Sequence, residues 1–233
     1  MQQEEAEATI PDTLEGKRAL LRTLMCIWQP QALDDDYLQA QDTELREQLR
    51  EKGIVRHTGR LWRGDITQLD VDAIVCSTDP HGLGGWNPAE RSVASAVHRA
   101  AGLQLRNECA KILHGEQIAT GGAIVTPGYN LPAKYVIHTV GPTCAVDGGG
   151  KPTRPTAGQE GQLAACYHTA LALARDFECR SIAFCCISTG AGQFPSRRAA
   201  TIAVSACHDA RMRVVFVPYT RKDYKIYSEL IAG

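Results

Sequence analysis

The sequence has no stretch that could cross a membrane and no secretory signal. No run of apolar residues comes near the ~20 that a transmembrane helix needs. The residues that follow Met1 are polar or acidic, whereas a signal peptide starts with a basic segment and continues into an apolar one. We therefore expect a cytoplasmic protein without membrane contact.

The sequence also lacks an excess of charge and the common nucleotide-binding fingerprints. Its 25 Lys and Arg residues are balanced by 26 Asp and Glu, which disfavours bulk attraction to nucleic acid. The basic residues at 151–154 and 197–198 are scattered and lack interleaved aromatic residues, so we expect no nucleic-acid partner. Neither a Walker motif nor Gly-x-Gly-x-x-Gly after a strand occurs, which disfavours nucleoside triphosphate hydrolysis and nicotinamide-dependent hydride transfer.

Cysteine is abundant, but its arrangement favours neither a metal cluster nor a disulfide framework. The nine cysteines are an odd number and include no Cys-x-x-Cys pair. Most lie within apolar runs, such as the run around Cys76 and the run that contains Cys185 and Cys186. We interpret them as reduced, small residues of a hydrophobic core.

The apolar pattern divides the chain into three parts. Residues 1–12 are acidic and predict a loose N-terminal tail. Residues 13–53 carry apolar residues at helical spacing, with a capping-box pattern that starts beside Thr13 and a stop at Gly53, so they predict a helical extension. Residues 54–233 form the main domain, which is long enough to build one packed hydrophobic core.

The main domain alternates short apolar runs with helical segments. This pattern predicts a three-layer α/β/α fold with a mixed, largely parallel sheet. The expected strands are 60–63, 72–77, 121–126, 134–139, 181–187 and 213–218, and the expected helices are 88–101, 103–113, 158–176, 195–210 and 221–231. In such sheets ligands bind at the carboxyl ends of the strands, so the loops that follow the strands are the candidate site.

The loop 188–195 is the clearest binding signal in the residues themselves. It joins an apolar strand to a helix, contains Gly190 and Gly192, and ends at Pro195, which we expect at the first helical position. Glycines let a ligand approach the backbone, and the N-terminus of a helix favours an anion. The loop 79–88, which contains Gly82, Gly84 and Gly85, has the same character, and the two loops together favour a diphosphate.

The order of several motifs resembles the macrodomain family, whose members bind ADP-ribose. These motifs are Leu61 to Thr67, Val71 to Val75, His98 to Gly102, Thr120 to Pro132, Val136 to Pro142 and Ile187 to Pro195. The helical extension and the segment Phe184 to Gly190 are more particularly similar to the zinc-dependent protein-ADP-ribose hydrolases. The resemblance implies a macrodomain over 54–233 that binds ADP-ribose or ADP-ribosylated protein, acts as a monomer and needs no cofactor.

The resemblance assigns ligand contacts to individual residues. Asp65 corresponds to the family's acceptor for the adenine amino group, the loop 188–193 to its diphosphate loop, Phe194 to an aromatic beside the ribose and Tyr219 to an aromatic near adenine. The alternative is a turn residue for Asp65 and ordinary core packing for the two aromatics. The expected ligand-binding residues are Asp65, Ile66, Asp79, Gly84, Gly85, Ser188, Thr189, Gly190, Ala191, Gly192, Gln193, Phe194 and Tyr219.

The catalytic residues of the zinc branch are replaced in this chain. Its Cys-x4-His-x-Cys ligands correspond to Gly85, Glu90 and Ser92, so the resemblance implies no metal here. The family's ribose-contacting asparagine corresponds to Asp79, and an acid of related hydrolases corresponds to Ala94.

Two functions remain open at this point. The first is an ADP-ribose-binding module without the zinc-dependent site. The second is a metal-free ADP-ribosyl hydrolase that uses Asp79 or Glu90 as a base. Both acids also have the simpler interpretation of solvated loop residues, and a scaffold that no longer binds a ligand is a third alternative.

Overall fold

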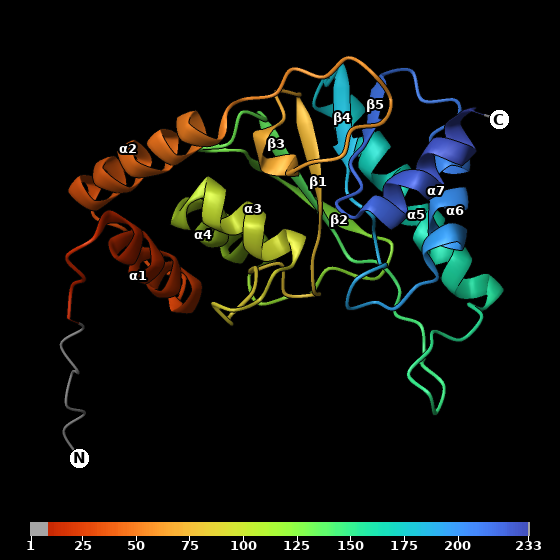
Figure 1. Ribbon diagram of the computed structural model, residues 1–233, viewed down its shortest axis with the longest axis horizontal. Helices are drawn as coiled ribbons and strands as arrows, with labels where there is room; N and C mark the ends of the chain where they lie inside the picture. The colour runs from red at the N-terminus through yellow and green to blue at the C-terminus, as the bar shows by residue number, and fades with distance from the viewer. Residues whose placement is uncertain (1–8, 233) are drawn as a thin grey trace.

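The computed structural model describes residues 9–232, which form a central sheet with helices on both faces (Figure 1). The predicted tail falls mostly on residues 1–8, outside the described residues. The strands are β1 (Ala73–Ser77), β2 (Ala123–Pro127), β3 (Tyr135–Thr139), β4 (Ser181–Phe184) and β5 (Arg213–Phe216). The helices are α1 (Leu14–Ile27), α2 (Asp35–Lys52), the 3-10 turn η1 (Ile66–Gln68), α3 (Val93–Ala101), α4 (Leu103–Leu113), α5 (Ala157–Asp176), α6 (Ser196–Ala206) and α7 (Arg221–Ala232).

The sheet is mixed and mostly parallel, as the apolar pattern predicts. Its strand order is β2-β3-β1-β4-β5. The pairs β3–β1, β1–β4 and β4–β5 are parallel, and only β2 runs antiparallel to its neighbour β3. The carboxyl ends of β3, β1, β4 and β5 therefore lie along one edge.

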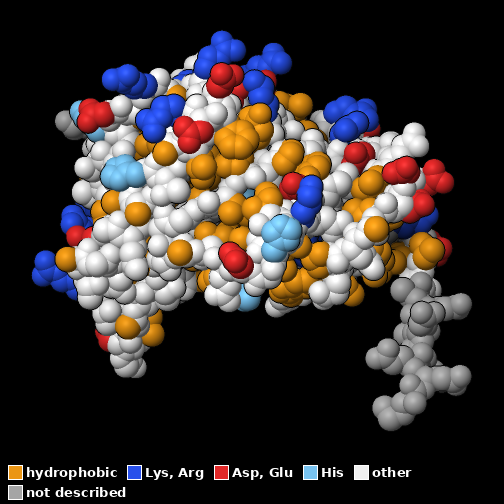
Figure 2. All heavy atoms as spheres, turned by 180° about the vertical axis from the view of Figure 1, so that it is seen from behind, with side chains coloured by type: hydrophobic (Ala, Val, Ile, Leu, Met, Phe, Trp, Pro, Cys, Tyr) orange, Lys and Arg blue, Asp and Glu red, His pale blue; other side chains and the backbone are white. Residues whose placement is uncertain are grey.

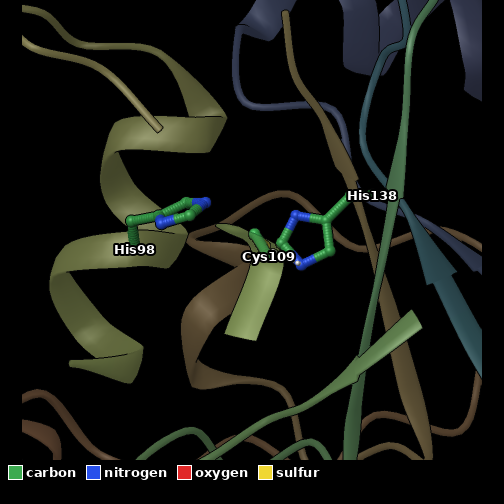
Figure 3. A group of neighbouring side chains, drawn as sticks. All are labelled: His98, Cys109 and His138. Atoms are coloured by element: carbon green, nitrogen blue, oxygen red, sulfur yellow. Dashed lines mark hydrogen bonds between the residues drawn. The ribbon is translucent and has the colours of Figure 1, made fainter. Parts of the chain in front are cut away.

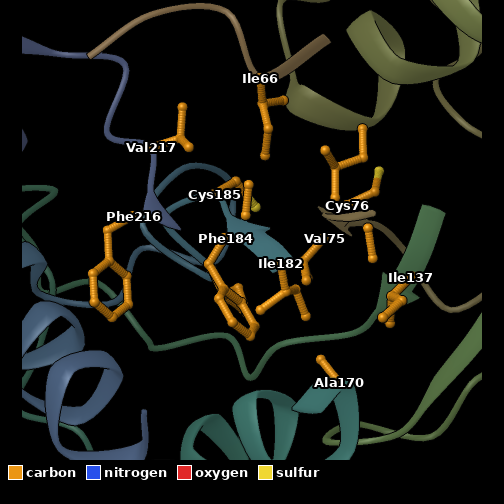
Figure 4. Packing of buried hydrophobic residues seen from close by; sticks show 14 of the residues in the cluster. Ile66, Val75, Cys76, Ile137, Ala170, Ile182, Phe184, Cys185, Phe216 and Val217 are labelled. Carbon is orange, nitrogen blue, oxygen red and sulfur yellow. The ribbon is translucent and has the colours of Figure 1, made fainter. Parts of the chain in front are cut away.

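Helices cover both faces of this sheet. Helices α3 and α4 contact β1 and β2, and α5 contacts β2 and β3 and continues into the layer of α6 and α7. A chain of aromatic rings runs through the core on the side of α5 and α7, from Tyr167 to Phe184 to Phe216 to Tyr227, with centroid separations of 5.0, 6.4 and 5.1 Å. Figure 4 shows how the apolar side chains of the strands fill the space between the layers. The three-layer α/β/α prediction is confirmed.

Several predicted elements differ from the structure near their ends; for example, α6 ends at Ala206 rather than at 210, and β5 ends at Phe216 rather than at 218. The expected strand 60–63 is a single parallel bridge between Leu61 and Phe216, the last residue of β5, so it lies beside the end of that edge strand without forming a ladder. β4 ends at Phe184 rather than at 187, and the chain then turns through Ser188 at a φ of +65°. α3 begins at Val93 rather than at 88, because the side chain of Ser92 caps it by accepting a hydrogen bond from the Ser95 N–H.

All nine cysteines are free thiols, as predicted. Eight of them are buried, and Cys186 is half-buried. All except Cys26 and Cys109 lie in or against the main apolar core, where a thiol behaves as a small hydrophobic residue.

The helices α1 and α2 form an additional layer against α3 and α4 (Figure 1). The buried guanidinium of Arg106 on α4 is the central contact of this layer. It donates hydrogen bonds of 2.8 Å to the carbonyls of Cys26 and Trp28 at the end of α1, and one of 3.2 Å to the carbonyl of Gly85. The same guanidinium lies 4.4 Å from the ring centroid of Trp86. Arg106 therefore connects the N-terminal helices to the loop that follows β1.

Charged residues of both signs lie side by side along the edges of the face drawn in Figure 2. No helix in residues 9–232 is long and apolar enough to cross a membrane.

Asp72 holds the amino ends of three strands together. Its carboxylate accepts hydrogen bonds from the Ser181 hydroxyl at 2.9 Å, from the backbone N–H groups of Arg180 and Ser181 at 3.0 Å each, and from Lys134 Nζ at 2.7 Å. Burial by itself raises the pKa of this carboxyl, but the hydrogen bonds from Lys134, Ser181 and Arg180 outweigh burial and lower the pKa to about 2. The ionised form is therefore strongly favoured in the folded state.

Asp72→Asn is expected to lower the free energy of unfolding at pH 7 by about 2 kcal/mol, the stabilisation that a carboxyl gains when folding lowers its pKa from 3.8 to about 2. Because the folded pKa is depressed, this contribution is fully present above about pH 4 and is lost as the pH falls toward 2. Urea titrations of both proteins at pH 7, 4 and 2 measure it. Asp209→Asn, at a fully exposed carboxylate, is the control. A difference between wild type and Asp72→Asn that stays constant with pH would contradict the assignment.

Arg106→Lys is expected to lower the free energy of unfolding by about 2 kcal/mol, because an ammonium group cannot reach all three carbonyls and buried acceptors are left unpaired. Hydrogen exchange should accelerate selectively at Gly85, Trp86 and the end of α1. Arg91→Lys, at an exposed position of the same loop, should change neither quantity. Uniform acceleration over the whole chain would mean that Arg106 stabilises the fold without holding the loop.

Candidate functional site

The candidate site lies at the carboxyl edge of the sheet, where four loops meet. The loops after β1, β4 and β5 leave from the same edge because these strands are parallel. Residues 60–62 extend the edge beyond β5, with hydrogen bonds from Trp62 N–H to the Phe216 carbonyl at 3.0 Å and from Phe216 N–H to the Arg60 carbonyl at 2.8 Å. The loop from 63 to 67 therefore joins the other three at this edge, as the sequence predicts.

Asp65 stands at the start of the turn η1 and has one carboxylate oxygen engaged. Its Oδ1 accepts hydrogen bonds from the Thr67 N–H at 3.0 Å and from the Thr67 hydroxyl at 2.7 Å. Its Oδ2 has only the Lys52 ammonium at 4.0 Å as a charged neighbour. Ile66 is buried in the core, and Figure 4 shows its side chain on the same side of the strands as Cys185 and Val217. The turn fixes Asp65 and leaves Oδ2 able to accept another hydrogen bond.

The loop 188–193 is folded so that several backbone N–H groups point away from the protein's own acceptors. Phe194 N–H donates to the Ser188 carbonyl at 2.9 Å, and Gln193 N–H donates to the Gly190 carbonyl at 3.0 Å. Within the described residues, the N–H groups of Gly190, Ala191 and Gly192 have no acceptor. The loop leads directly into α6, whose N-cap is Pro195; the first helical residue is Ser196, one residue later than predicted. Three free N–H groups before a helix N-terminus form an anion-binding arrangement.

Gly192 makes this loop geometry possible. A Cβ at this position would lie 2.7 Å from the Ser188 carbonyl oxygen and 3.0 Å from the Pro142 carbonyl oxygen. Ser188 and Gln193 adopt positive φ values of 65° and 51°, which few side chains favour. The hydroxyl of Ser188 is buried and has no hydrogen-bond partner among the described residues.

The two predicted aromatic contacts differ in their surroundings. Tyr219 follows β5 and is 77% exposed, so its ring is free to stack on a ligand. Phe194 is only 2% exposed and packs within the main core. Its ring anchors the end of the loop 188–193 and presents no free face at the surface.

The first half of the loop after β1 is a compact turn. Asp79 is exposed, and its Oδ1 accepts hydrogen bonds from the N–H groups of His81 at 2.8 Å and Gly82 at 3.2 Å. Gly82 and Gly84 have φ values of 65° and 75°. A Cβ at Gly84 would lie 2.7 Å from Cγ of His98, so the backbone at Gly84 passes directly over that imidazole ring. The carboxylate of Asp79 is therefore occupied in shaping its own turn.

The positions that correspond to the zinc ligands come together in space, but they do not form a zinc site. The Glu90 carboxylate and the Ser95 hydroxyl both lie against Gly85, where any side chain would collide with them. The Ser92 hydroxyl is 3.0 Å from the Ser95 hydroxyl. One carboxylate and two hydroxyls do not match the Cys and His donors that bind zinc with tetrahedral geometry. Glu90 is thus the single ionisable residue among the three positions that correspond to the zinc ligands.

Arg106 and Ser95 are two residues of this region that the sequence does not single out. Arg106 donates to Gly85, and Cys26 Sγ donates to the same carbonyl at 3.1 Å. Arg106 and Ser95 look like ordinary polar positions on short helices, so no pattern in the sequence signals their role.

A surface hollow of about 500 Å³ lies away from this edge, on α2. It is lined by Asp36, Gln39, Ala40, Thr43, Glu44 and Glu47, whose acids disfavour an anionic ligand.

Comparisons with known proteins place the chain in a family. The model of the Macro domain family matches residues 75–203. A protein of Treponema medium named protein-ADP-ribose hydrolase is 39% identical over 243 residues, which cover 96% of this chain and 90% of that protein.

Two solved structures have the same fold. The macrodomain of Trypanosoma brucei in complex with ADP-ribose is 27% identical, with a TM-score of 0.65 over 91% of this chain and 95% of that chain. The macrodomain of Oceanobacillus iheyensis with ADP is 32% identical, with a TM-score of 0.64 over 76% of this chain and 94% of that chain. The chain belongs to the macrodomain family.

Proposed function

We propose that this protein binds ADP-ribose, free or attached to another protein, at the carboxyl edge of its sheet. The observation that carries the proposal is the set of three free N–H groups at Gly190, Ala191 and Gly192 before α6. A diphosphate is the group that such an arrangement binds best, because each N–H donates to an anionic oxygen and the helix dipole adds to the attraction.

The remaining loops suit the two ends of the same ligand. Asp65 Oδ2 accepts a hydrogen bond from the exocyclic amine of adenine, and Tyr219 offers an exposed ring for stacking. Because β4 lies between β1 and β5, the loop after β1 lies on the other side of the diphosphate loop, where the distal ribose would be placed. Family membership and the ligands named for the T. brucei and O. iheyensis structures support this orientation.

Asp65→Asn is expected to weaken ADP-ribose binding at least about tenfold, because the amide keeps the Oδ1 acceptor of the turn but replaces Oδ2 with a donor that opposes the adenine amine. Calorimetric titration of ADP-ribose into each protein measures the change. The wild type should also discriminate against the hypoxanthine analogue of ADP-ribose, which lacks the exocyclic amine, and Asp65→Asn should not.

Asp70→Asn is the matched control, since Asp70 lies beyond the same turn and pairs with Arg56. It should leave both affinities unchanged. Equal affinity of the wild type for the two nucleotides would remove Asp65 from the adenine site. Absence of binding by the wild type at millimolar ADP-ribose would contradict the proposed function as a whole.

Hydrolysis of the bond between ADP-ribose and protein is the second candidate function. The observation that favours it is the position of the Glu90 carboxylate, which lies against Gly85 and the Ser95 hydroxyl at the ribose end of the proposed site. A carboxylate held there by the loop is placed to activate a water molecule as a general base. Asp79 is less suited, because its Oδ1 already accepts two backbone hydrogen bonds. The T. medium relative is named for this reaction.

Glu90→Gln is expected to slow release of ADP-ribose from an ADP-ribosylated protein by about 100-fold if Glu90 is the base, with the affinity for ADP-ribose unchanged. Release of radiolabelled ADP-ribose under single-turnover conditions, after metal removal by a chelator, gives the rate. Glu116→Gln, at an exposed acid outside the site, is the control. Release by the wild type that Glu90→Gln does not slow would remove Glu90 from catalysis. No release over a panel of linkages would leave binding as the function.

A further inference from the structure

Three metal-ligating side chains meet inside the protein, in a cluster formed by His98, Cys109 and His138. They come from α3, α4 and β3, and their side chains point toward one another (Figure 3). One ligand atom of each residue lies within 4.8 Å of the others. His98 is 5% exposed, and Cys109 and His138 are fully buried.

The two imidazoles of the cluster lack the hydrogen bonds that buried rings normally make. Neither ring nitrogen of His98 has a partner among the described residues, and Nδ1 of His138 has none either. His138 Nε2 lies 3.0 Å from the Thr126 hydroxyl and 3.6 Å from Cys109 Sγ. Burial of a polar group without a hydrogen bond costs about 1–3 kcal/mol of stability. A bound cation that accepts the nitrogen lone pairs would offset this cost.

The spacing of the cluster agrees with coordination of one metal ion. Bond lengths of about 2.3 Å to sulfur and 2.05 Å to nitrogen, at angles between tetrahedral and trigonal, place the two ligand atoms about 3.6–3.8 Å apart. The Cys109 Sγ to His138 Nε2 separation is 3.6 Å. All three ligand atoms lie within 4.8 Å of one another, so coordination of one ion requires them to move closer by about 1 Å at most.

We propose that His98, Cys109 and His138 form a binding site for one soft monovalent cation, Cu(I). The donor set of two imidazoles and one thiolate suits Cu(I), which is stable with three ligands of this kind. None of the three residues belongs to the proposed ADP-ribose contacts, so this inference is independent of the proposed function.

Charge favours a monovalent ion over a divalent one at this site. A Cys thiolate and Cu(I) together are neutral, whereas the same thiolate with Zn²⁺ leaves a net positive charge in a buried place. Arg106 adds a positive charge near His98 and Cys109, and the Glu108 carboxylate adds a negative charge near Cys109. These two charges offset each other, so the neutral pair of thiolate and Cu(I) is favoured over a net positive pair of thiolate and Zn²⁺.

The ligands are in suitable protonation states, apart from one proton on Cys109. Burial lowers the pKa of both His98 and His138, so both rings are neutral near pH 7 and offer a lone pair. Burial raises the pKa of Cys109 to about 12, so the thiol carries its proton until the ion binds. Binding thus forms the Cu–S bond, releases one proton to solvent and transfers no electron.

A small cavity borders the cluster at His98. Its volume is about 10 Å³, and Met25, Cys26 and Arg106 also line it. That volume suits one atom or a water molecule and excludes larger ligands.

The test is an anaerobic competition for Cu(I) between chelator-treated protein and bathocuproine disulfonate. The wild type should take up one equivalent, with X-ray absorption showing two nitrogen and one sulfur neighbours. Among its seven histidines, nitrogen-detected NMR should show perturbed ring signals at His98 and His138 only. These two measurements use the unaltered chain, so they do not depend on whether a variant folds.

Variants then assign the thiolate. Cys109→Ser should weaken Cu(I) binding by more than about 100-fold. Cys207→Ser, at another buried thiol, and Cys26→Ser, at the small cavity, should keep the full affinity. Zn²⁺ titrated under the same conditions should bind more weakly than Cu(I).

Three results would overturn the proposed site, and a fourth would overturn the proposed ion. The first is unchanged Cu(I) affinity in folded Cys109→Ser. The second is loss of binding in Cys26→Ser, which would place the ion in the small cavity. The third is histidine signals that do not change on addition of one equivalent of Cu(I), which would make the cluster a packed group of neutral side chains. Tighter binding of Zn²⁺ at the same three residues would contradict the choice of a monovalent ion.

Discussion

Parallel pairing around β1 is the constraint on which the candidate site depends. β1 lies between β3 and β4 and is parallel to both, so loops that are far apart in the sequence start from the same edge. The pairing is maintained at the opposite edge by Asp72, which bonds to the start of β4 and to Lys134 before β3. The polar network is thus at the amino ends of the strands, and the carboxyl ends are left to glycine-rich loops with free N–H groups. The fold separates the stabilising end of the sheet from the binding end.

The loop after β1 depends on a second layer of support. Between Ser77 and Val93 it contains no helix or strand, so its shape comes from contacts with other elements. Arg106 and Cys26 bond to its Gly85 carbonyl, and Arg99 donates to the Glu90 carbonyl at 3.2 Å. Because one of these contacts comes from α1, the N-terminal helices support the site as well as the fold. Their removal would leave buried carbonyl and guanidinium groups unpaired.

The sequence predicts the architecture well because each element carries its own signal. Continuous apolar runs mark the strands, and α4 begins and ends where predicted, after Gly102. The element 60–63 was wrong as a strand because it meets β5 only at Phe216, and no local pattern shows where two distant segments meet. In the site, the loop 188–193 could be predicted from its glycines, whereas Arg106 could not, since its partners are backbone carbonyls distant in sequence. The cluster of His98, Cys109 and His138 was missed for the same reason: its ligands come from three elements rather than from one spaced motif.

Gly84 is the point where the loop after β1 contacts His98 of α3. Its backbone passes over the His98 ring so closely that a Cβ would lie 2.7 Å from Cγ. The imidazole of His98 therefore contacts the loop after β1 and also belongs to the cluster with Cys109 and His138. The absence of a side chain at Gly84 makes room for this imidazole beneath the loop, and any larger residue at position 84 would displace either the ring or the loop.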